Sequence, residues 1–129
     1  MRNLLPGTIR LIAGPVAVVE VAGLALRAAV SPTRWLVPGA AVGVAIRSED
    51  IALAPPAERH APDLNAVPAV VAEVRAEGVG WRVRCAPPLA LDALLPRWSA
   101  PPLPGEAVTA LIRPVAAHVF EAERGAPPA

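Results

Sequence analysis

The stretch PGAAVGVAIR, residues 38–47, returns as PGEAVTALIR, residues 104–113. The match extends outward from this stretch in both directions. Each half opens with an asparagine that has a proline three positions later, at Asn3 and Asn65, and each half carries an Arg-Trp pair, at residues 34–35 and 97–98. The landmarks keep one order while their spacing grows from 62 to 66 residues. We therefore predict two copies of one unit that differ by small loop insertions.

Within each copy the apolar residues alternate with a period of two, which is typical of half-buried strands. The apolar face of residues 79–85 consists of Val79, Trp81, Val83 and Cys85, and the opposite face carries Arg82 and Arg84. Residues 24–30 alternate in the same way. The pattern predicts about four short strands in each half, and a solvated arginine face on residues 79–85.

Composition supports a strand-rich fold. The chain has 129 residues with 17 prolines and nine glycines, too many for a helical bundle because a proline inside a helix costs about 3 kcal/mol. We predict an all-β fold of small OB-like barrels within one domain, residues 1–129. Repeat one spans about residues 3–53, a proline-rich connector residues 54–64, repeat two about residues 65–121, and a disordered tail residues 122–129.

Charge and hydropathy exclude two classes of partner. The net charge is +1, and the twelve basic side chains are all arginine, so the basic excess of a nucleic-acid domain is missing. Trp81 could stack on a base, but it falls on the face opposite Arg82 and Arg84. The most apolar stretch, residues 11–30, contains Pro15 and Glu20, which argues against a membrane span.

Three segments together resemble a known family. Residues 38–53 resemble the signature PG-x-x-V-x-x-x-IRPED-x-x-L of the TOBE region, at the C-terminal end of the ATP-binding subunits of bacterial ABC importers. Residues 3–7 resemble the N-x-x-PG start of that region, and residues 117–120 resemble the D-A-H-x-F finish seen in the polyamine and ferric-iron importers. Ser48 stands where the family usually has proline, and Ala116 where it often has aspartate.

The resemblance implies a non-catalytic accessory or regulatory domain. Such a domain supports dimerisation of the ATPase subunit, docks on the ATPase domain of the same parent chain, contacts the membrane permease subunits indirectly, and in some relatives senses a ligand or partner. Its place is cytoplasmic, peripheral at the inner membrane. ATP and magnesium would bind outside this chain, which has no lysine for a phosphate loop. One small relative binds molybdate through a lysine- and serine-containing motif that is not present here, so the resemblance implies no oxyanion site.

Six residues are interface or structural candidates: Trp35, Arg47, Glu49, Asp50, Trp98 and Arg113. For Arg47 and the two carboxylates, the alternative to an interface is a local ion pair that caps a turn. For each tryptophan, the alternative is that its ring plugs a barrel end while the neighbouring arginine stacks on it.

Catalytic and metal sites are not predicted. His60 and His118 lack the further ligands that zinc needs, and Ser31, Ser48 and Ser99 lie outside any nucleophile motif. Cys85 is predicted to be a small, buried hydrophobic residue. The chain is therefore predicted to be no enzyme and to hold no cofactor.

A second hypothesis from another class stays open. The chain can be a free-standing module that binds a small anion or oxyanion, in which a cleft between the repeats holds the ligand through Arg47, Arg82 or Arg113.

Overall fold

The computed structural model describes residues 2–31 and 36–122, which form an all-β structure as predicted. Each half contributes five strands to it. The first half supplies β1 (Arg2–Ala13), β2 (Val16–Val21), β3 (Leu24–Ala29), β4 (Ala41–Arg47) and β5 (Ala52–Ala54). The second half supplies β6 (Asn65–Glu77), β7 (Gly80–Cys85), β8 (Asp92–Pro96), β9 (Ala107–Ile112) and β10 (Ala117–Glu121). A 3₁₀ turn precedes each fifth strand, η1 (Ser48–Asp50) in one half and η2 (Pro114–Ala116) in the other.

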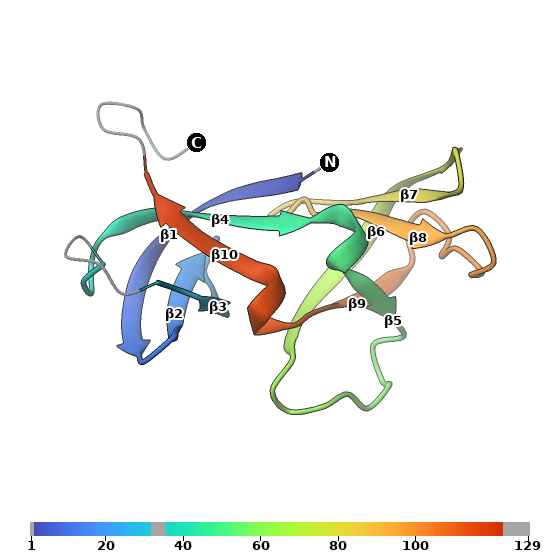
Figure 1. Ribbon diagram of the computed structural model, residues 1–129. Helices are drawn as coiled ribbons and strands as arrows, with labels where there is room; N and C mark the ends of the chain where they lie inside the picture. Colours follow the sequence, from blue (N-terminus) through green and yellow to red (C-terminus); the bar gives the residue numbers. More distant parts are fainter. Residues whose placement is uncertain (1, 32–35, 123–129) are drawn as a thin grey trace.

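The two halves exchange their fifth strands. A closed barrel has the order β1-β2-β3-β10-β4, and the second sheet has the order β5-β9-β6-β7-β8. Strand β10 therefore completes the barrel of the first half, while β5 pairs with β9 of the second half (Figure 1). Each half therefore has five strands, where the sequence predicted about four. The additional strands, β5 and β10, pair with strands of the other half.

The two Pro-Gly turns have the same backbone conformation. Gly39 and Gly105 have φ angles of 90° and 88°, a left-handed backbone that glycine adopts without steric cost. The Gly39 N–H donates to the Ile9 carbonyl at 2.7 Å, and the Gly105 N–H donates to the Val71 carbonyl at 2.7 Å. Each acceptor lies at a register irregularity of the long first strand of its half. The two Pro-Gly turns thus occupy equivalent places.

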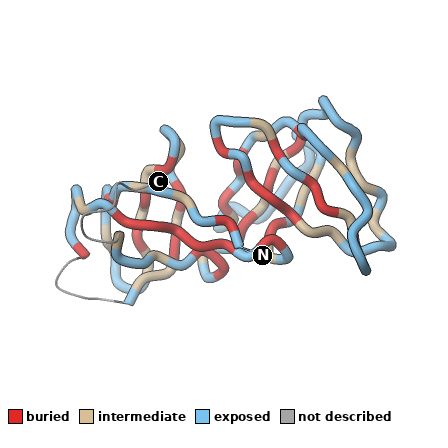
Figure 2. Tube along the Cα trace, turned by 90° about the horizontal axis from the view of Figure 1, so that it is seen from above, coloured by how far each residue is buried: buried red, intermediate tan, exposed pale blue. Residues whose placement is uncertain are grey.

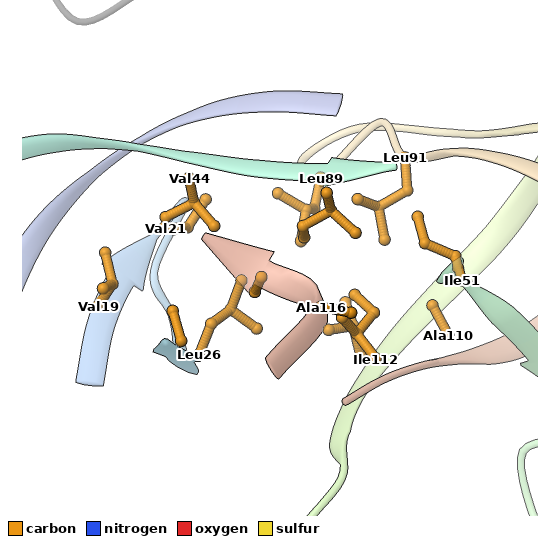
Figure 3. Packing of buried hydrophobic residues seen from close by; sticks show 14 of the residues in the cluster. Val19, Val21, Leu26, Val44, Ile51, Leu89, Leu91, Ala110, Ile112 and Ala116 are labelled. Atoms are coloured by element: carbon orange, nitrogen blue, oxygen red, sulfur yellow. The ribbon is translucent and has the colours of Figure 1, made fainter. Parts of the chain in front are cut away.

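One apolar core joins the two sheets. Buried residues occupy the strands of both sheets and continue through the region where the sheets meet (Figure 2). Leu89 and Leu91, from the segment between β7 and β8, lie in the same cluster as Val44 of the first barrel and Ile112 of the second sheet (Figure 3). Cys85 is buried in the same core, as predicted. Because the core is shared, the junction of the halves has a defined geometry.

Candidate functional site

Two asparagines bind the halves together at this junction. The Asn3 Nδ2 group donates to the carbonyls of Ile46 at 3.2 Å and Asp92 at 2.9 Å, and the Asp92 N–H donates to Asn3 Oδ1 at 2.7 Å. Asn65 makes the equivalent pair of bonds with the backbone of Arg27, both at 2.8 Å. Each asparagine begins one repeat and holds the third strand of the other. The sequence marked them only as landmarks of the repeat.

A buried ion pair lies beside the Asn3 clamp. Arg82 Nη1 is 2.6 Å from Asp92 Oδ1, and the same guanidinium donates from Nε and Nη2 to the two Glu77 oxygens at 2.6 and 3.0 Å. Ser48 Oγ donates to Asp92 Oδ1 at 3.5 Å. The Arg82 side chain is only 8% exposed. The prediction of a solvated arginine face is therefore wrong for Arg82. Its side chain is buried because it forms ion pairs with Glu77 on β6 and Asp92 on β8.

This pairing predicts an acid-sensitive stability. The hydrogen bond from Arg82 lowers the pKa of Glu77 below its ordinary value of 4.5. The stabilisation is present above that value and is lost as the pH falls through the lower folded pKa. In urea unfolding from pH 7 downward, the wild type should lose more stability in this acid range than Glu77→Gln. Glu58→Gln, an exposed control in the connector, should follow the wild type, and identical curves for wild type and Glu77→Gln would contradict the assignment.

Next to the clamp lies a surface cavity of about 340 Å³, which we term the junction hollow. It is lined by Arg2, Asn3, Leu4, Leu5, Arg84, Ala90 and Asp92. Arg2 and Arg84 are exposed, and neither forms an ion pair with any residue in the described ranges. Asp92 is the one carboxylate in this lining, and Arg82 neutralises it.

The strand register places another arginine near this hollow. Arg2 lies directly opposite Arg47 on β4. Like charges at opposite positions of an antiparallel pair repel each other. Asp50 neutralises the charge of Arg47, because Arg47 Nε lies 3.1 Å from Asp50 Oδ2. Among the described residues, no carboxylate forms an ion pair with Arg2. The junction hollow therefore has a net positive lining that suits an anion.

The residues singled out from the sequence fall into separate places. Arg47 and Asp50 form the local ion pair that was the alternative to an interface role. Glu49, Asp50 and Arg113 line a second hollow, whose lining includes neither Arg2 nor Arg84. Of the three arginines proposed to hold an anion, Arg82 forms ion pairs with two carboxylates and Arg47 with one.

For Trp98, the alternative of a ring that fills a barrel end does not hold. Trp98 is 87% exposed, so it plugs no barrel end. The Arg97 guanidinium lies 5.4 Å from the ring centre of Trp81, not over its neighbour Trp98. Val79 is 85% exposed because β7 begins only at Gly80. Trp35 lies outside the described residues.

Other classes of site find no support in the described ranges. No group of three histidine, cysteine or carboxylate side chains is placed to hold a metal ion there. Burial raises the pKa of the Cys85 thiol, and the nearby Asp92 charge adds to the effect, so this thiol is held in its unreactive protonated form. Within residues 2–31 and 36–122, no helix has the length and apolar character of a membrane span.

The fold and the junction define a two-repeat protein with one closed OB-like barrel, one five-stranded sheet and exchanged fifth strands. The chain is similar to a crystal structure of ModG, described as a cytoplasmic molybdate-binding protein, in a form with molybdate bound. The TM-score is 0.80 at 16% sequence identity, over 93% of this chain and 96% of that chain. No family model and no curated protein matches the sequence. The similarity supports the predicted TOBE-like, OB-like fold.

Proposed function

We propose that this protein binds a small tetrahedral oxyanion in the junction hollow. One observation carries the proposal: Arg2 and Arg84, from different repeats and without an ion-pair partner in the described ranges, line a single hollow whose carboxylate is already neutralised. Guanidinium groups present several N–H donors in a fixed plane, which matches the oxygens of such an anion. The molybdate named in the ModG structure belongs to the same chemical class.

We expect the ligand to rely on these two side chains. The amide group of Asn3 is committed to the backbones of Ile46 and Asp92, so it positions the hollow and does not serve as a free donor. Arg82 has a similar indirect role, because it removes the charge of Asp92 that would otherwise repel an anion. Asn3 and Arg82 are thus positioning residues, and Arg2 and Arg84 are the proposed ligand contacts.

The accessory-domain hypothesis is less well supported than this one. A similar solved structure is that of a molybdate-binding protein, which favours the small-anion alternative. Dimerisation, docking on an ATPase domain and contact with permease subunits remain predictions from the resemblance.

Calorimetric titration with molybdate, tungstate, sulfate and phosphate tests the proposal. Hydrogen bonds to charged groups contribute about 1.5–3 kcal/mol each, so Arg2→Gln and Arg84→Gln should each weaken the best-bound anion by about tenfold to a hundredfold. Added salt should also weaken binding.

Arg59→Gln is the matched control, because it removes one exposed arginine from the connector. It should bind the anion as the wild type does. The proposal fails if none of the four anions binds, or if Arg59→Gln weakens binding as much as Arg2→Gln.

A further inference from the structure

The junction hollow is larger than a bare tetrahedral anion requires. Its volume of about 340 Å³ lies in the range of about 300–1,000 Å³ that is usual for sites of small organic ligands. A tetrahedral oxyanion has four oxygens around one central atom, and a water molecule takes about 30 Å³ of the liquid. An anion held by Arg2 and Arg84 therefore leaves part of the hollow open to a further group.

Apolar side chains form much of the remaining lining. Leu4 and Leu5 belong to β1, and Ala90 belongs to the segment between β7 and β8. Leu5 packs against the shared core, whereas Leu4 is 63% exposed and Ala90 is exposed as well. The two remaining lining residues, Asn3 and Asp92, are hydrogen-bonded to each other. The hollow thus combines two guanidinium groups with an accessible leucine.

Arg2 and Leu4 lie on the same face of β1. Residues 2–8 of this strand pair with β4 in an unbroken register, so the strand is extended here. Side chains two positions apart in a strand point to the same side, and Leu4 follows Arg2 by about 7 Å along the strand. A short carbon chain attached to an anion at Arg2 can reach Leu4 over this distance.

The internal repeat indicates that the fold does not require the two arginines. The residue before the second asparagine is Leu64, where the first repeat has Arg2. Arg84 lies opposite the β8 residue whose backbone is held by the first asparagine. Its counterpart, opposite the β3 residue held by the second asparagine, is Val18. Apolar residues occupy both equivalent places, so the pair of arginines is a feature of this hollow rather than of the repeat.

We propose that the junction hollow binds tetrahedral oxyanions that carry one short apolar substituent, such as alkyl phosphonates. Arg2 and Arg84 hold the oxygens, and the substituent lies along β1 against Leu4. The inference rests on the proposed function, because it uses the same two guanidinium groups, and it adds the class of ligand. Each methylene group that leaves water on binding increases the affinity by about fourfold.

Calorimetric titration with methylphosphonate and propylphosphonate tests the inference, because the two ligands share one charged group. Propylphosphonate has two further methylene groups, and in an open hollow we expect it to bind about threefold to tenfold more tightly. Leu4→Ser should reduce this ratio of affinities to less than about twofold, because it removes the apolar contact. Arg2→Gln should weaken both ligands to the same extent and leave the ratio unchanged.

Leu11→Ser is the matched control for the leucine substitution. Leu11 is 57% exposed on the same strand, but it does not line the hollow. Its replacement should leave the affinities for both phosphonates unchanged. In methyl spectra of the wild type, propylphosphonate should shift the Leu4 resonances more than methylphosphonate does, and it should leave those of Leu11 in place.

The outcomes separate this inference from the oxyanion site itself. If methylphosphonate binds but propylphosphonate binds no more tightly, the inference is overturned and the oxyanion site stands. The same holds if Leu4→Ser keeps the wild-type ratio, or if Leu11→Ser lowers the ratio as much as Leu4→Ser does. If neither phosphonate and none of the inorganic anions binds, the inference and the proposed function fail together.

Discussion

Replacing Arg82 with methionine should lower the free energy of unfolding by about 3–5 kcal/mol, the cost of removing one partner from a buried ion pair. The change leaves the carboxylate of Asp92, whose side chain is 12% exposed, without its charged partner. It also removes two hydrogen bonds to Glu77. Urea unfolding at pH 7, followed by tryptophan fluorescence, measures the loss.

Two further variants separate the buried pair from a general charge effect. Arg75→Met removes an exposed arginine whose contacts with Glu73 and Glu77 are 3.9 and 3.8 Å long, and it should cost at most about 1 kcal/mol. Adding Asp92→Asn to Arg82→Met should recover part of the stability, because the uncompensated charge is gone. If Arg82→Met costs no more than Arg75→Met, the buried pair does not hold the junction.

Asn3→Ala should destabilise the protein by about 2–4 kcal/mol, since it removes three hydrogen bonds and leaves backbone groups of Asp92 unsatisfied. Asn65→Ala removes two bonds to Arg27, in a partly buried setting, and should cost less. The same urea experiment measures both changes. The two clamps share no hydrogen-bonding partner, so the double variant should show nearly additive losses.

Thr8→Ala is the control for this second prediction. Thr8 is exposed on the same strand as Asn3, so its replacement should change stability by less than about 0.5 kcal/mol. A loss for Asn3→Ala within that range would show that the clamp is not what joins the halves.

The all-β fold could be predicted because its signals are local. Alternating apolar residues and the two Pro-Gly turns lie in the sequence next to the structures that they form. The strand exchange could not be predicted in this way. Residues 52–54 have the same short apolar pattern whichever sheet they join, and only the contact with β9 in the folded chain decides.

The candidate site was less predictable for the same reason. Arg82 was expected in solvent because period-two alternation places it opposite the apolar face, but that pattern contains no information on the carboxylates of neighbouring strands. Asn3 was visible only as a landmark, since its partner Asp92 lies 89 residues away. A useful signal was the recurrence of asparagine at the start of both repeats. A polar amide side chain at the start of an apolar strand suggests a specific hydrogen bond to the backbone.

Anomalous diffraction from crystals grown with tungstate tests the oxyanion site most directly, because a tungsten atom can be located without assumptions about the ligand. We predict a peak in the junction hollow with its oxygens within hydrogen-bond distance of both Arg2 and Arg84, and no such peak in crystals of the doubly substituted Arg2→Gln, Arg84→Gln protein. Peaks confined to contacts between neighbouring molecules, or an occupied site elsewhere with the junction hollow empty, would contradict the proposed function.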